Sequence, residues 1–137
     1  MTQQFLSLAA NRPTVARLMH DDVLRVDAEP LLRLRAAEGP IVAAERVAVA
    51  REVIAYRRAQ LATLHQACAF ARLGREVRAI AEVSAPIGLT DLTMVSAHVL
   101  DCLDRNDPAA LGATLSRLER LCNQAVELTS TLQHQGG

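Results

Sequence analysis

The chain has 137 residues, enough for one domain with its own core, and its 15 arginines balance 15 Asp plus Glu. Half of the residues are hydrophobic, mostly Ala and Leu, and only 2% are aromatic, which favours helices over strands. The neutral balance and the scarcity of aromatic rings argue against binding to nucleic acid or to an anionic membrane surface. No apolar run approaches the length of a membrane span.

The start of the chain, MTQQFLSLAANR, has no basic segment ahead of a long apolar run, so we expect no secretory signal peptide. The three cysteines, Cys68, Cys102 and Cys122, lie far apart and beside apolar residues. This pattern predicts reduced thiols packed in a core, and a reducing, cytoplasmic compartment. The sequence has neither CxxC nor a Cys/His pair at zinc-finger spacing, so we expect no metal and no cofactor.

Helix breakers mark where the first helices are expected to begin and end. NRPT at 11–14 opens a first helix that should run to about Val26, and DAEP at 27–30 opens a short second helix that Gly39 closes. Pro40 suits the first turn of a third helix, because its missing N–H would be unpaired there in any residue.

The third helix is expected to be long, from 40 to 72. Its apolar side chains recur every seven residues at Val47, Ile54, Leu61 and Cys68. An unbroken helix of this length would span about 50 Å, more than a small bundle needs to cover its core. We therefore predict a homodimer through this helix or through the N-terminal helices. Gly74 is expected to interrupt or bend the element, which then continues as far as Pro86.

Two further helices follow. A break at Gly88 precedes the first of them, which Thr90 should cap through its hydroxyl. One stripe of that helix is apolar: Leu92, Val95, Val99 and Leu103. Asp107 and Pro108 are the expected N-cap and first residue of the last helix. Its buried face is expected at positions spaced alternately by four and three, namely 111, 115, 118, 122, 125, 129 and 132.

These elements predict an all-α fold: an antiparallel up-down four-helix bundle with additional N-terminal helices. No repeat or low-complexity linker divides the sequence. We therefore expect a single domain over 1–137, with the N-terminal helices in 1–40 and the bundle in 41–133.

In IGLTDLTMVSAHVLD, at 87–101, the apolar-Gly pair Ile87-Gly88 precedes a helix with Leu92, Ala97 and Leu100-Asp101 at set intervals. This arrangement resembles the histidine-containing phosphotransfer (HPt) domain of two-component phosphorelays, over about residues 61–133. The resemblance implies a helical bundle that docks a receiver domain or a histidine kinase.

The same alignment places Arg78, ten residues before Gly88, where the HPt family has its reactive histidine. Ala81 takes the place of the family's Lys, and Glu82 the place of its Gly. A phosphorelay histidine offers a neutral ring nitrogen to a phosphoryl group, whereas Arg stays protonated and has no lone pair to offer. Glu82 adds bulk and negative charge where the phosphoryl group would arrive. Arg78 and Glu82 are one helical turn apart, so they can pair with each other.

The sequence also allows a second alignment to the HPt family. HQACAFARLG places His65 before small residues and Gly74, nine residues on, which would make His65 the phosphoacceptor. Its spacing differs from that of the family by one residue, and it leaves two helices after Pro86 unexplained. The other interpretation of His65 is a residue at the edge of the core, beside Leu64 and Cys68.

The sequence thus predicts a non-catalytic HPt-like signalling adaptor or regulator, with Arg75, Arg78 and Glu82 as its docking face for a receiver domain or histidine kinase. The same three residues also fit an ordinary solvated helix surface. One alternative is a helical dimerisation or interaction protein unrelated to phosphorelays. Another is an active phosphotransfer protein that uses His65. No nucleophile–base pair, phosphate loop or zinc motif adds an enzymatic candidate.

Overall fold

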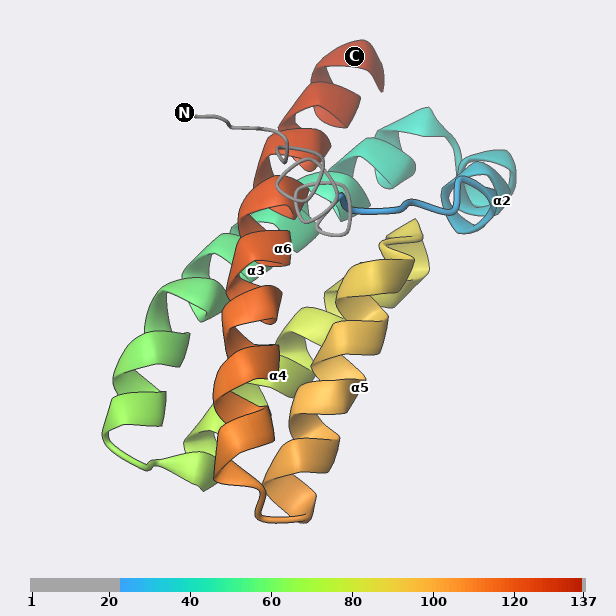
Figure 1. The fold of residues 1–137 in the computed structure, drawn as a ribbon. Helices are drawn as coiled ribbons and strands as arrows, with labels where there is room; N and C mark the ends of the chain where they lie inside the picture. Colours follow the sequence, from blue (N-terminus) through green and yellow to red (C-terminus); the bar gives the residue numbers. More distant parts are fainter. Residues whose placement is uncertain (1–22, 137) are drawn as a thin grey trace, which may run out of the picture.

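The computed structural model describes residues 23–136, with side chains as far as residue 131. The regular structure in this part of the chain is helical, with no strand (Figure 1). Its elements are α2 (Glu29–Glu38), α3 (Pro40–Gln66), α4 (Phe70–Ser84), the short 3-10 helix η2 (Ala85–Ile87), α5 (Thr90–Asp104) and α6 (Pro108–Gly136). The predicted all-α class is confirmed for the described residues.

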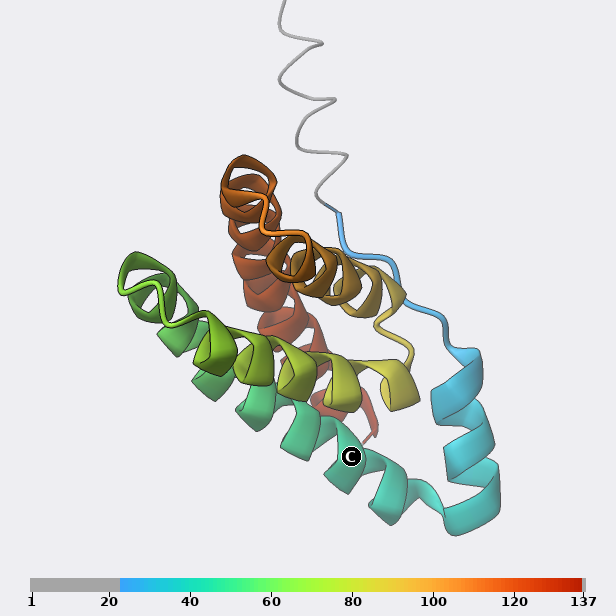
Figure 2. The same cartoon turned by 90° about the horizontal axis from the view of Figure 1, so that it is seen from below.

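Each of the four long helices packs against two others. α3 lies against α4 and α6, and α5 lies against the same two helices from the other side (Figures 1 and 2). The shorter α2 packs on α3 and η2 at one end of this arrangement, as the view along the helices shows (Figure 2). No helix within residues 23–136 combines the length and the apolar composition that crossing a bilayer requires.

The core lies between the four long helices and is aliphatic. Every predicted apolar position of the last helix from 111 to 129 is buried, and so are Leu92, Val95 and Val99 of α5. The largest side chains that are almost fully buried include Ile54, Leu61, Leu73, Leu92 and Leu118. These residues come from all four helices, so the apolar stripes read from the sequence meet in one cluster.

The long third helix is shorter than predicted. α3 ends at Gln66, and the chain turns through residues 67–69, with Cys68 in the left-handed region at φ 55°. The turn lets Leu64 at the end of α3 and Leu73 in the first turns of α4 point into the same core. Gly74, expected to interrupt the element, lies inside α4 instead. Cys68, expected in the core, is exposed in the turn.

Apart from the end of α3, some helix termini agree with the sequence and others differ. Pro40 begins α3 and Gly39 ends α2, and the Asp107 carboxylate accepts a hydrogen bond from Ala110 N at 3.2 Å, as an N-cap should. Thr90 does not cap α5: its hydroxyl instead lies 3.4 Å from the carbonyl oxygen of Arg25. The predicted first helix lies outside the described residues over 11–22, and it does not extend to Val26, because residues 23–28 have no regular structure.

Candidate docking site

The three residues predicted as a docking face lie on the outward side of α4. Arg75, Arg78 and Glu82 are all exposed, and Arg72 adds a third exposed arginine one helical turn before Arg75. None of the three arginines forms an ion pair or hydrogen bond with a described residue. Arg78 and Glu82, which the sequence allows to pair, form no ion pair, and among the described residues the face carries three arginines against one carboxylate.

Arg78 is folded back along the seam between α4 and α5. One guanidinium nitrogen, Nη1, lies 3.7 Å from the point where a Cβ on Gly74 would stand. The side chains of Leu100 and Leu103 on α5 come within 3.8–3.9 Å of the same point. The arginine and the two leucines thus converge over Gly74, which is buried.

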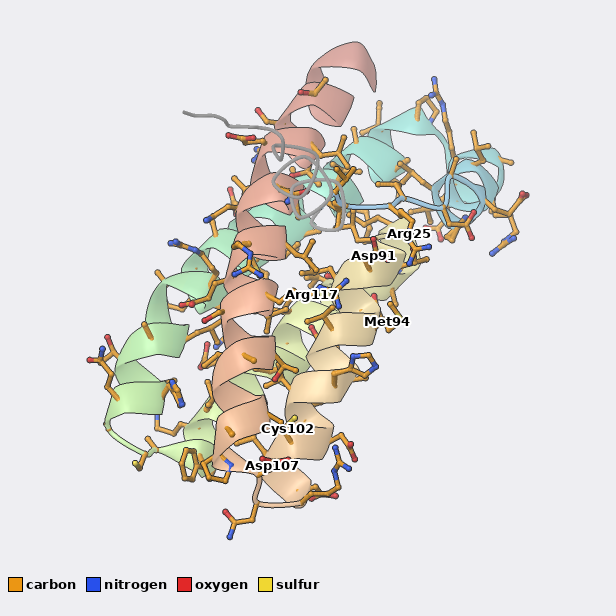
Figure 3. All side chains as sticks on the ribbon, viewed as in Figure 1. Arg25, Asp91, Met94, Cys102, Asp107 and Arg117 are labelled. Atoms are coloured by element: carbon orange, nitrogen blue, oxygen red, sulfur yellow. The ribbon has the colours of Figure 1, made fainter. Side chains whose placement is uncertain are left out.

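α5 packs against α4, and its solvent side carries further exposed residues. Met94 exposes 40% of its surface there (Figure 3), and Ala97, His98 and Asp101 are also exposed. The carboxylate of Asp101 pairs with Arg105 at 3.0 Å, one turn further along the helix. This side of α5 therefore carries a methionine and an ion pair, whereas α4 carries the three arginines.

His65 stands apart from these residues. It lies in the last turn of α3, is half-buried, and is followed after one residue by the turn to α4. Because Gly74 lies within α4, it does not end a helix that carries His65. Arg78, by contrast, lies near the middle of its helix, and Gly88 adopts a left-handed conformation, φ 82°, ten residues later.

A second polar cluster joins the N-terminal segment to the start of α5, and sequence reasoning missed it. Residues 23–28, here called the strap, cross the turn between α4 and α5 before entering α2 (Figure 2). The carboxylate of Asp91, in the first turn of α5, accepts a hydrogen bond from Arg25 N at 2.9 Å and two from the Arg25 guanidinium, from Nη2 at 2.8 Å and from Nε at 3.0 Å. Figure 3 shows the two side chains meeting at that end of α5.

These bonds change the acidity of Asp91. The hydrogen bonds from the Arg25 guanidinium are the largest cause that lowers the pKa of Asp91, and they outweigh the opposing effect of burial. The charge of Arg117 on α6 acts in the same direction as Arg25. No sequence signal links Arg25 to a carboxylate 66 residues away, so only the tertiary structure reveals this pair.

One further ion pair, which is partly buried, joins α3 to α4. Arg57 places its Nη1 3.1 Å from both carboxylate oxygens of Glu76, which is only 8% exposed. A buried carboxylate needs such a partner, and the pair fixes the register of the two helices. It is a structural contact, because the arginine and the carboxylate satisfy each other.

The described residues contain no group of three or more His, Cys, Asp or Glu side chains that could hold a metal ion. The buried hydroxyl of Ser84 donates to Ile80 O at 2.6 Å, within its own helix. No protein-family model, curated protein or solved structure matches the chain.

Proposed function

We propose that this protein is a non-catalytic adaptor of the HPt type, which docks a receiver domain or a histidine kinase through the outward face of α4 without carrying phosphate. The proposal begins from the resemblance at Ile87-Gly88 and along α5. It is supported by the left-handed conformation of Gly88 at the end of η2, and by the exposed, mid-helix position of Arg78.

The proposed architecture is an antiparallel up-down four-helix bundle of α3, α4, α5 and α6, with α2 at one end. Two observations support it. The connections at 67–69 and 105–107 are short, as antiparallel neighbours require. Each helix packs against the next one in the chain, and the last, α6, packs against the first, α3.

The observation that carries the function is that Arg72, Arg75 and Arg78 form no ion pair or hydrogen bond with another described residue. Three guanidinium groups on one exposed helix face favour a partner with an acidic surface, because complementary charge speeds and orients association. Gly74 is buried, with the side chains of Arg78, Leu100 and Leu103 beside it, so a partner would meet the arginine side chains and not the backbone of α4. An arginine cannot accept the phosphoryl group that an HPt histidine carries, so the role proposed for this face is docking without phosphotransfer.

Binding to purified receiver domains tests the docking face. The double change Arg75→Glu and Arg78→Glu should weaken binding by about tenfold or more, since it places carboxylates where complementary charge is needed. Arg33→Glu with Arg35→Glu is the matched control, because both arginines are exposed on α2 and the change in net charge is identical. Equal weakening by both pairs would show a general charge effect and contradict the assigned face.

Phosphotransfer is tested separately. Incubation with a receiver phosphorylated by acetyl phosphate should leave no acid-labile phosphate on the protein. If acid-labile phosphate appears on the native protein and is lost in His65→Ala, the protein is a phosphotransfer protein that uses His65, and the alignment through Arg78 is wrong.

The converse test is to introduce a phosphate-accepting histidine at position 78. Arg78→His alone should stay inert, because Glu82 still occupies the approach to the new imidazole. The triple change Arg78→His, Ala81→Lys and Glu82→Gly should accept phosphate from a receiver that binds the native protein. If it stays inert with a receiver that it still binds, the phosphorelay origin of the face is contradicted.

A second candidate function, self-association, is favoured by a different observation. Ile41, Val49 and Tyr56 expose 74%, 51% and 63% of their surfaces, and their spacing puts them on one side of α3. The heptad repeat that predicted a homodimer does not support it, because Val47, Ile54 and Leu61 are buried within the chain itself. The proposed dimer therefore uses the opposite side of the helix.

Light scattering at micromolar concentration tests this candidate and should give the mass of a dimer. Val49→Glu with Tyr56→Glu should then give a monomer. Leu32→Glu is the control, because this leucine is equally exposed, at 59%, but lies on α2. A monomer mass for the native chain removes the dimer.

A further inference from the structure

The strap is held to the rest of the molecule mainly by polar contacts. Val23 and Val26 are 54% and 40% exposed, and only Leu24 among its apolar residues packs against the core. A segment with little buried apolar surface and no regular structure is the kind that opens locally, at a lower free energy than the whole fold.

Most of these polar contacts end on one carboxylate. Asp91 is 4% exposed and accepts both the backbone N–H and the guanidinium of Arg25. The Arg25 side chain covers the carboxylate from outside and is itself 75% exposed. Opening of the strap would therefore uncover a charged acceptor that the closed state shields from water.

The backbone of the strap is fitted against the turn before α5. Asp27 N donates to Gly88 O at 2.8 Å, and Leu24 N donates to the side-chain oxygen of Gln124 on α6 at 2.8 Å. A Cβ on Gly88 would stand 1.8 Å from Asp27 O, so the closed strap requires glycine at this position. One short segment makes all of these contacts, which favours their forming and breaking together.

We propose that the strap is a latch that opens and closes as one unit while α3–α6 stay folded, and that Asp91 is the side chain that holds it closed. Opening frees the Asp91 carboxylate in the first turn of α5 and the Gly88 carbonyl in the turn before that helix. It also frees α2 from its tether at this end of the molecule, since the strap leads directly into α2. The latch is distinct from the docking face, because no hydrogen bond or ion pair joins Arg72, Arg75 or Arg78 to the strap.

Amide hydrogen exchange of the full chain, followed residue by residue by NMR, tests the latch. Arg25→Ala and Asp91→Asn should each speed exchange at the amides of Leu24 and Asp27 by about tenfold or more, because each removes charge-assisted hydrogen bonds. The slowest amides of α3–α6 should keep their native exchange rates in Arg25→Ala, which alters an exposed side chain and leaves the core untouched.

Asp101→Asn is the matched control, since it removes a carboxylate from the same helix and breaks an exposed pair with Arg105. It should leave strap exchange unchanged. Unchanged strap exchange in both Arg25→Ala and Asp91→Asn overturns the role of Asp91. If strap and core amides speed up together in Arg25→Ala, the strap is part of the global unfolding unit and the latch is wrong.

Discussion

At the scale of single residues, Asp91 makes closure of the strap depend on pH. Its folded pKa is lowered, above all by hydrogen bonds from Arg25, so its stabilising contribution is complete above the ordinary Asp pKa of about 3.9. The contribution is lost as pH falls through the lower folded pKa, because protonation removes the charge that Arg25 binds. Arg25 stays protonated over this range.

We therefore predict that the strap amides become less protected as pH is lowered from 6 towards 3, before the core amides do, once intrinsic exchange rates are taken into account. In Asp91→Asn the strap should show no such dependence, because residue 91 no longer titrates. A native strap whose protection stays constant to the acid unfolding transition would contradict the role of this carboxylate.

The cysteines give a second prediction at this scale. Cys102 and Cys122 are buried, and burial raises the pKa of the Cys122 thiol to about 12, so almost no thiolate is present at neutral pH. Cys68 is exposed in the turn after α3. One thiol per chain should therefore react quickly with a thiol reagent in the native state, and Cys68→Ser should abolish that fast phase. Rapid reaction of either buried thiol without denaturant would contradict the packing.

At the scale of elements, two glycines are expected to respond in opposite directions to the same substitution. Gly88→Ala forces a side chain into a left-handed conformation and against the strap backbone, and should destabilise the protein by about 1–3 kcal/mol. Gly112→Ala lies inside α6 with no heavy atom within 4 Å of the new Cβ, and should stabilise it by about 0.5–1 kcal/mol.

Urea unfolding followed by circular dichroism compares the two variants directly. Strap exchange should increase in Gly88→Ala and stay native in Gly112→Ala. If Gly88→Ala has the same free energy of unfolding as the native chain, the turn and the strap can move apart without loss of stability, which contradicts the close packing.

At the scale of the whole molecule, stability is expected to come from the aliphatic core between the four long helices. Leu118 of α6 is fully buried, so Leu118→Ala should cost about 2–5 kcal/mol through lost apolar burial and the cavity left behind. Leu32→Ala on α2, where the side chain is 59% exposed, should change the free energy of unfolding by less than about 0.5 kcal/mol. Similar losses in both variants would show that α2 belongs to the cooperative core.

The sequence by itself determined the helical class, most helix limits and the buried stripes. The apolar spacings of α5 and α6 predicted their buried faces, and Gly39, Pro40 and Asp107 marked helix ends, because these signals are local and depend only on nearby residues. It also placed Arg75, Arg78 and Glu82 on one helix face, since residues three and four apart share a face.

Only the tertiary structure decided where α3 ends and how the strap is held. Residues 67–69 carry no strong breaker, and the turn forms there because Leu64 and Leu73 must both reach the core. That requirement also leaves Cys68 outside. Arg25 and Asp91 are paired across 66 residues of sequence, and Gly88 must be glycine because Asp27 approaches it. Such contacts follow from the packing of distant segments, which no local pattern encodes.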